Sequence, residues 1–322
     1  MDRNLGINLV RVTEAAALGG AMYLGKGDKN RADKAAVDNM RNMFDTIDIE
    51  GVVVIGEGEM DEAPMLYIGE EIGTKGMGYQ KVDIAVDPID GTNAVAKGLN
   101  NAIAVCALAP RGAMLAAPDM YMDKLAAGPK AKGVIDIDAS VEDNLRNVAK
   151  ALNKNLSDLT ATMLDRDRHQ YIIDVCRELG VRVKLFQDGD VDAAIATCFE
   201  DSGVDIMFGM GGAPEGVIAA AAIKCLGGDM QARLKPMNDE EIARCKKMGA
   251  AYETKLTIDD LVAGEDIYFA ATGISDGEFT RGVRYLGENK ASTQTLMLRG
   301  KTGTIRYIDA VHQLDKKPEY AK

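Results

Sequence analysis

Between residues 142 and 226 the sequence alternates regularly between helical and strand-like patterns. Strands separated by helices of about 10–15 residues are typical of βα units and a parallel sheet. This stretch alone therefore predicts an α/β fold for the second half of the chain. The predicted helices cover residues 142–152, 168–179, 191–198 and 216–226, and the predicted strands cover 160–164, 181–186 and 204–208.

The first half has a different pattern, typical of an α+β arrangement. Two helices are predicted within about the first 45 residues, followed by strands at 52–55, 82–86 and 102–108 and a loop at 128–133. Strand-like patterns return after about residue 250, at 266–272, 293–299 and 302–311. We expect two domains with a boundary near residue 150, because 322 residues exceed the usual size of one domain.

Composition excludes several classes of protein. The net charge is −12 at pH 7, which disfavours binding to nucleic acid. No apolar run approaches the roughly 18 residues of a membrane helix, and no secretory signal is visible after Met1. We therefore expect a cytoplasmic protein with neither a membrane nor a nucleic-acid partner.

Any metal site in this chain must be built from oxygen ligands. The five cysteines are dispersed without a Cys-x-x-Cys pair, which indicates reduced core thiols. Only two histidines are present, at His169 and His312. Asp and Glu are abundant, and their oxygens suit Mg²⁺ or Mn²⁺.

The most informative motif follows the strand predicted at 82–86. Pro88 cannot donate a hydrogen bond to a neighbouring strand, so we expect the strand to stop there with Asp87 at its end. Asp87 and Asp90 then flank a tight turn, Gly91 allows the backbone to pass close to a ligand, and Thr92 is a suitable helix N-cap. Two carboxylates at such a turn repel each other unless a divalent cation lies between them, although solvated aspartates are the alternative.

Two further carboxylates are candidate metal ligands. Glu57 follows the strand at 52–55 with a glycine on either side, and an acidic surface turn is the alternative reading. Asp33 lies on the apolar face of its predicted helix, where a charge is unexpected unless it stabilises the first helical turn.

The second half carries candidate phosphate and metal ligands at strand ends. Residues 206–216 form a strand, a glycine-rich turn and a helix, but Pro214 breaks the dinucleotide-binding fingerprint. The turn can still cradle a phosphate or place Glu215 on a metal. Two other predicted strands end at Asp188-Gly189-Asp190 and at Arg166-Asp167-Arg168. The paired arginines match phosphate oxygens, and a solvated helix start is the alternative for them.

At Asp87-Pro88-Ile89-Asp90-Gly91-Thr92 the sequence resembles the Mg²⁺-dependent, lithium-sensitive sugar and inositol phosphatases. The resemblance narrows to class II (GlpX-type) fructose-1,6-bisphosphatases and runs from about residue 5 to 312. It rests on the motifs GDKN (27–30), VIGEGE (54–59), DEAPMLYIGE (61–70), APDMYM (117–122) and GGAPEG (211–216).

The resemblance implies a layered α-β-α-β-α fold with a metal-binding α+β domain at 1–150 and an α/β substrate-binding domain at 151–322. It also implies a homo-oligomer, a dimer or tetramer, that uses Mg²⁺ or Mn²⁺ to remove the 1-phosphate of fructose 1,6-bisphosphate in gluconeogenesis. Thr92 would orient or deprotonate the attacking water, with Asp33 as its proton partner and Glu57 beside it. The implied metal ligands are Asp33, Glu57, Asp87, Asp90 and Glu215. The implied substrate contacts are Asp90, Gly91, Thr92, Tyr121, Arg166, Asp167, Arg168, Asp188, Gly189, Asp190 and Gly212.

Two departures from the family pattern leave the substrate preference open. Class II members often have Glu at the position of Asp90, and Lys-Pro-Arg or Arg-Pro-Arg at 166–168, where this chain has an acid at Asp167. Sedoheptulose 1,7-bisphosphate is therefore an alternative or second substrate. An inositol phosphatase and a non-catalytic sugar-phosphate sensor are less favoured alternatives.

Overall fold

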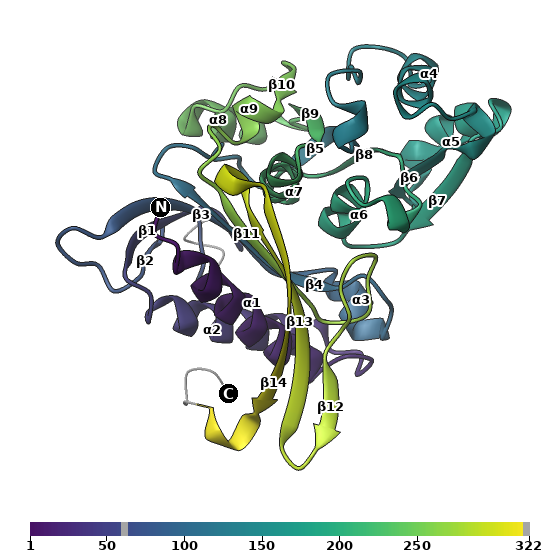
Figure 1. The fold of residues 1–322 in the computed structure, drawn as a ribbon. Coiled ribbons are helices and arrows are strands. Elements are labelled where there is room, and N and C mark those ends of the chain that lie inside the picture. The colour runs from purple at the N-terminus through teal and green to yellow at the C-terminus, as the bar shows by residue number, and fades with distance from the viewer. Residues whose placement is uncertain (59–63, 318–322) are drawn as a thin grey trace. The chain divides into compact units, whose positions relative to one another are not determined.

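The computed structural model describes residues 1–58 and 64–317, and its chain divides into two units (Figure 1). Residues 1–114 and the chain from 264 onward form the first unit, and residues 115–263 form the second. This differs from the predicted boundary near residue 150. The strands after residue 264 join the sheet of the first unit. A prediction that divides the sequence into two continuous halves misses this pairing. Part of the motifs at 54–59 and 61–70, namely residues 59–63, lies outside the described residues.

The first unit is built on an eight-stranded sheet. Its order is β12-β13-β11-β4-β3-β1-β2, and β14 pairs with β13. The strands are β1 (Ile49–Ile55), β2 (Glu71–Ile72), β3 (Gln80–Asp90), β4 (Ile103–Pro110), β11 (Tyr268–Gly273), β12 (Arg284–Gly287), β13 (Lys290–Arg299) and β14 (Thr304–Gln313).

Two long helices pack on this sheet, α1 (Leu5–Ala21) and α2 (Lys29–Phe44) (Figure 1). Asp28 caps α2 by accepting a hydrogen bond from the Arg31 amide. Gly19 of α1 lies so close to α2 that a Cβ atom there would sit 2.7 Å from the Ala35 carbonyl oxygen. The absence of a side chain at Gly19 therefore allows α1 and α2 to pack closely against each other.

Strand β3 does not end at Pro88 as predicted. It continues to Asp90, and its register with β4 shifts between Asp87 and Asp90. A shift of this kind accommodates a residue that cannot donate to the ladder. Strands β1 and β3 are parallel, so their carboxyl ends lie at the same edge of the sheet.

The second unit contains a six-stranded sheet of order β10-β9-β5-β8-β6-β7. Its strands are β5 (Tyr121–Ala127), β6 (Thr160–Leu164), β7 (Arg182–Phe186), β8 (Ile206–Gly212), β9 (Asp229–Leu234) and β10 (Leu256–Thr257). Strand β6 is parallel to β7 and β8, as predicted, but β5 is antiparallel to β8 and β9. The parallel pairing expected from the βα pattern is therefore confirmed for its three strands, and β5 and β9, which lie outside that pattern, make the whole sheet mixed.

Helices lie on both faces of this second sheet, as expected for an α/β unit. Side chains of α4 and α5 form an apolar core with alternate residues of β5, β6 and β8, and α6 and α7 contact each other and the same strands. The helix predicted to start at Arg168 begins at Gln170 and is preceded by a 3₁₀ turn, Asp167–His169. The helices are α4 (Val141–Leu152), α5 (Gln170–Glu178), α6 (Asp190–Ala196), α7 (Ala213–Leu226), α8 (Asp239–Met248) and α9 (Ile258–Leu261).

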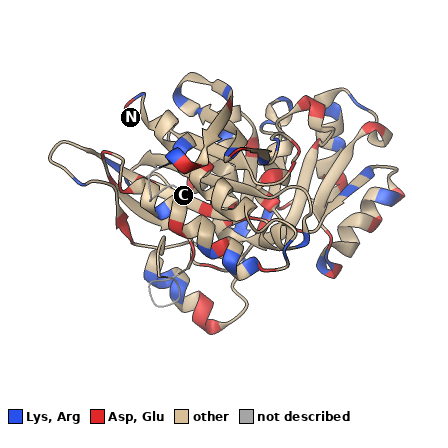
Figure 2. Cartoon of the chain, turned by 90° about the horizontal axis from the view of Figure 1, so that it is seen from below, with Lys and Arg blue, Asp and Glu red and all other residues tan. Residues whose placement is uncertain are grey.

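Both units thus combine helices with mixed sheets, which confirms the α/β class; the five-layer stacking of the whole chain stays a prediction. In the view of Figure 2, acidic and basic residues are interspersed along the elements. Across residues 1–58 and 64–317, no helix is long and apolar enough to cross a membrane. All five cysteines are free thiols.

Candidate active site

The end of β1 brings Glu57 into a closely packed turn of the first unit. A Cβ atom at Gly56 would lie 1.9 Å from the Leu66 carbonyl oxygen, so no larger residue fits there. The Glu57 amide donates to that same oxygen at 3.0 Å. The backbone of Glu57, whose side chain is half-buried, is therefore fixed at the carboxyl edge of β1.

The end of β3 places two aspartates at the same edge. An Asp87 carboxylate oxygen accepts a hydrogen bond from the Ile89 amide at 2.9 Å, and Asp90 is only 4% exposed. Gly91 has a φ of 102°, which favours glycine, and it caps the short helix α3 (Thr92–Lys97). Thr92 is therefore the first residue of α3, and the prediction that it is the N-cap is wrong.

Asp33 reaches this region from helix α2. Helix α2 contacts α3, and the loop before α2 is tied to α3 by hydrogen bonds from the Gly25 and Gly27 amides to the Val95 and Ala96 carbonyls. Asp33 is half-buried, and desolvation raises its pKa above the ordinary value. The elements that carry Asp33 and Thr92 are therefore in direct contact.

In the second unit, the glycine-rich end of β8 makes room for charged side chains. A Cβ atom at Gly212 would lie 1.9 Å from a Glu215 carboxylate oxygen, and one at Gly211 would lie 2.1 Å from an Asp190 oxygen. Burial and the neighbouring Asp190 raise the pKa of Glu215 to about 7. Within the described part of the chain, the buried Glu215 Oε2 atom has no hydrogen-bond partner, which is unusual for a buried carboxylate oxygen.

Lys124 is a functional candidate that the sequence did not reveal. Its Nζ atom lies 2.6 Å from Asp190 Oδ2, and the two side chains are 2% and 8% exposed. Lysine in a strand normally points to solvent, and no motif surrounds this one, so only its burial could have identified it. It supplies the positive charge beside Asp190 and lowers the pKa of Glu215, against the larger effect of burial.

The predicted arginines lie at the same edge of the second sheet. Arg168 donates from Nε and Nη2 to the Met210 carbonyl, and its guanidinium stacks 5.1 Å from the Tyr121 ring centroid. Arg166 donates to the carbonyls of Asp165 and Gln187. Tyr121 joins them because it pairs directly with Gly212 across β5 and β8.

The remaining predicted contacts lie on the turns of this edge. Asp188 and Gly189 follow β7, with Gly189 at a φ of 81° as the cap of α6, and Asp190 begins that helix. Asp167 begins the 3₁₀ turn after β6. Each unit therefore gathers its own share of the predicted residues at one sheet edge.

His169 is a second residue missed from the sequence. Its Nδ1 atom lies 2.8 Å from the Leu164 carbonyl oxygen, and the Met210 amide donates to its Nε2 atom at 2.9 Å. These contacts require a neutral ring with its proton on Nδ1, and desolvation lowers its pKa accordingly. His169 thus joins the turn that carries Arg166 and Arg168 to β8.

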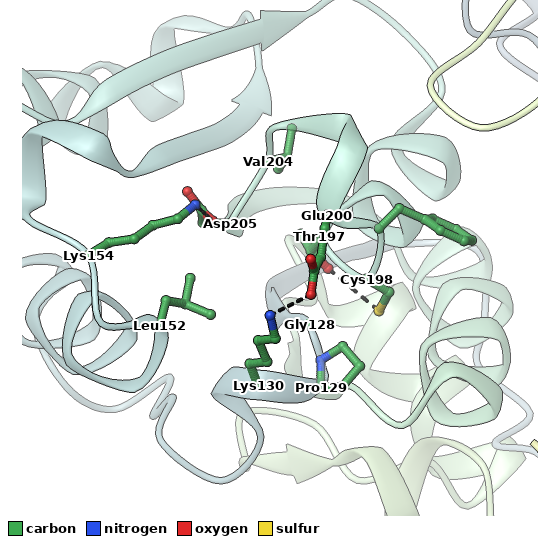
Figure 3. A pocket seen from close by; sticks show the side chains of 11 residues that line it. Gly128, Pro129, Lys130, Leu152, Lys154, Thr197, Cys198, Glu200, Val204 and Asp205 are labelled. Carbon is green, nitrogen blue, oxygen red and sulfur yellow. Dashed lines mark hydrogen bonds and ion pairs between the residues drawn. The ribbon is translucent and has the colours of Figure 1, made fainter.

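The second unit also contains a cavity of about 340 Å³ (Figure 3). It opens at the opposite edge of the sheet, where Lys130 pairs with Glu200 at 2.5 Å and Lys154 with Asp205 at 2.6 Å. It holds none of the predicted site residues. In residues 1–58 and 64–317, no three Asp, Glu, His or Cys side chains are grouped closely enough to hold a metal ion.

Comparison with known proteins agrees with the pattern of these motifs. Residues 3–312 match the sequence model of the family described as bacterial fructose-1,6-bisphosphatase, glpX-encoded. The chain is 51% identical to fructose-1,6-bisphosphatase 1 class 2 of Escherichia coli K12, over 98% of this chain and 97% of the relative. It is 48% identical to fructose-1,6-bisphosphatase class 2 of Haemophilus influenzae, over 98% of both chains. The chain belongs to the glpX-encoded bacterial fructose-1,6-bisphosphatase family.

Proposed function

We propose that this protein is a fructose-1,6-bisphosphatase, which hydrolyses the 1-phosphate of D-fructose 1,6-bisphosphate to fructose 6-phosphate and phosphate in gluconeogenesis. The proposal rests on the sequence identity to class 2 fructose-1,6-bisphosphatases, which is 48–51% over 98% of this chain. The carboxylates at the ends of β1 and β3 and at the start of α7 support it.

The proposed cofactor is divalent Mg²⁺ or Mn²⁺. Asp33, Glu57, Asp87, Asp90 and Glu215 would hold it, because they supply oxygen ligands and because Glu215 Oε2 has no other partner in the described chain. Such an ion, when bound, neutralises phosphate charge and lowers the pKa of a bound water.

The protein's own groups would divide the remaining work. Thr92 would orient the attacking water from the first turn of α3, and Asp33 would accept a proton. Arg166 and Arg168 would hold the phosphate that is not cleaved, with Tyr121, Asp167, Asp188–Asp190 and Gly212 as further substrate contacts. The amides of Gly91 and Thr92 would bind the reacting phosphate.

A phosphate-release assay tests this function. We expect hydrolysis of fructose 1,6-bisphosphate with added Mg²⁺ or Mn²⁺, and no turnover in excess EDTA, because the carboxylates cannot converge without cations. Full activity in EDTA would contradict the metal-dependent mechanism.

The same assay addresses the second candidate substrate. The acid at Asp167, between two arginines, changes the charge of the distal phosphate site and favours testing sedoheptulose 1,7-bisphosphate beside the fructose ester. Equal kcat/KM for the two esters would identify a dual bisphosphatase. We also propose that the enzyme is cytoplasmic and homo-oligomeric, a dimer or tetramer.

A further inference from the structure

We propose that Arg41 and Glu70 form a brace that aligns the Asp33 and Glu57 carboxylates for a shared metal ion. This inference rests on the metal site proposed above and assigns a role to two residues outside the predicted ligands. The brace joins helix α2, which carries Asp33, to the turn after β1, which carries Glu57.

On the helix side, Arg41 lies two turns after Asp33 on α2. Its Nε atom donates to Glu70 Oε1 at 2.6 Å, and the two side chains are only 18% and 11% exposed. A helix is stiff over two turns, so fixing Arg41 also fixes the position of the Asp33 backbone.

On the turn side, the other oxygen of Glu70 accepts a hydrogen bond from the Leu66 amide at 2.5 Å. The Leu66 carbonyl in turn accepts the hydrogen bond from the Glu57 amide at 3.0 Å. Glu70 therefore connects Arg41 to the Glu57 backbone through a single intervening residue.

Backbone contacts make this connection tight. Leu66 is fully buried with a φ of 56°, a left-handed conformation that is unfavourable for leucine and has to be held by its surroundings. The absence of a side chain at Gly56 lets the Leu66 carbonyl approach. Residues 68–70 are further fixed by the Gly69 amide, which donates to the Val53 carbonyl at 2.7 Å, and the Val53 amide, which donates to the Glu70 carbonyl at 2.9 Å.

The half-buried position of the pair separates it from ordinary surface ion pairs. Exposed pairs add little to stability, whereas a hydrogen-bonded pair shielded from water holds its geometry firmly. Outer-shell partners of metal ligands typically change metal affinity by about 10–100-fold when removed. A brace of this kind should therefore act on metal affinity before it acts on substrate binding.

Direct titration of Mn²⁺ into the full-length protein without substrate, by calorimetry, tests the brace. We expect Arg41→Met and Glu70→Gln each to raise the Mn²⁺ dissociation constant by about 10–100-fold. Saturating Mn²⁺ should restore most of kcat, with KM for the sugar bisphosphate little changed. Arg41→Lys keeps a donor and the charge, so it should fold normally and weaken Mn²⁺ binding less than Arg41→Met.

Asp45→Asn is the matched control, because Asp45 is the more exposed ion-pair partner of Arg41, at 56% against 11% for Glu70. It should bind Mn²⁺ as the parent does. Unchanged Mn²⁺ affinity in Arg41→Met and Arg41→Lys, with or without a lower melting temperature, would overturn the brace and leave the proposed function intact. If Asp33→Asn also left Mn²⁺ binding unchanged, the proposed metal site itself would fail, and the brace with it.

Discussion

Thr92 is the residue on which the proposed proton chemistry depends. It is half-buried at the first position of α3, and Gly91, rather than Thr92, is the helix cap. Its hydroxyl is therefore not needed to cap the helix. Replacing it should reveal a chemical role with little structural effect.

Thr92→Ala should lower kcat by about 10²–10⁴-fold, the usual contribution of a positioned proton-transfer group. Its melting temperature should stay near that of the parent, and Thr92→Ser should retain much of the activity because it keeps the hydroxyl. Steady-state kinetics with calorimetric substrate affinity measure both. If the alanine variant turns over within about fivefold of the parent, the water is activated without this hydroxyl.

Residue types at strand ends were predictable from sequence, but burial was not. Asp87, Asp90 and Glu57 follow apolar runs that mark strands, so their place at one sheet edge could be expected. Lys124 and His169 occupy positions with no motif, and only tertiary packing shows that both are buried.

At the scale of elements, the junction between β8 and α7 shows how glycine shapes the site. Gly212 has a φ of −65° and ψ of 140°, which any residue adopts, so a backbone constraint does not explain it. Its role is to leave space for the Glu215 carboxylate.

Gly212→Ala should therefore fold normally and lose activity. The three atoms nearest to the added methyl group all belong to the end of the Glu215 side chain, which can rotate away. Glycine replacement at an allowed φ tends to stabilise by about 0.4–1 kcal/mol. We expect an unchanged or slightly higher melting temperature together with weaker Mn²⁺ binding. A variant with parental Mn²⁺ affinity would show that Glu215 does not have to keep this position.

Helices and strands were predicted well where the apolar periodicity was regular. The prediction failed where pairing with a distant strand sets the end of an element. The strand predicted at 160–164 matches β6. The helix predicted at 142–152 is α4, which begins one residue earlier, at Val141. The predicted end of β3 at Pro88 was wrong because the register shift beside β4 accommodates the proline. Pairing of this kind depends on residues distant in sequence.

At the scale of the whole molecule, the order of strands in the first sheet could not be read from the sequence. Strand β11 lies between β4 and β13, although about 150 residues that form the second unit separate it from β4 in the chain. A linear scan predicts the strands after 264 but not the sheet that they complete.

These returning strands bury a group of titratable residues against α1. His312 on β14 is 7% exposed, and its Nε2 atom lies 2.7 Å from the Thr293 hydroxyl of β13 and 3.9 Å from Glu14 of α1. Desolvation, with the nearby Lys317, lowers the pKa of His312 from 6.5 to about 4, whereas burial raises that of Glu14. The stability of the first unit should therefore depend on pH.

Whether stability rises or falls with pH depends on whether the folded or the unfolded state binds the proton more tightly. His312 binds a proton near pH 6.5 when unfolded but only near pH 4 when folded, so its contribution is complete above 6.5 and is lost as pH falls to about 4. The loss amounts to about 3 kcal/mol. Glu14 acts in the opposite direction, because a raised carboxyl pKa favours the folded state as pH falls.

Comparing the parent with His312→Gln separates the two effects, since the glutamine keeps a partner for Thr293 but does not titrate. Denaturant midpoints measured from pH 7 to 4 should fall more steeply for the parent than for His312→Gln, and parallel curves would show that His312 does not set this dependence.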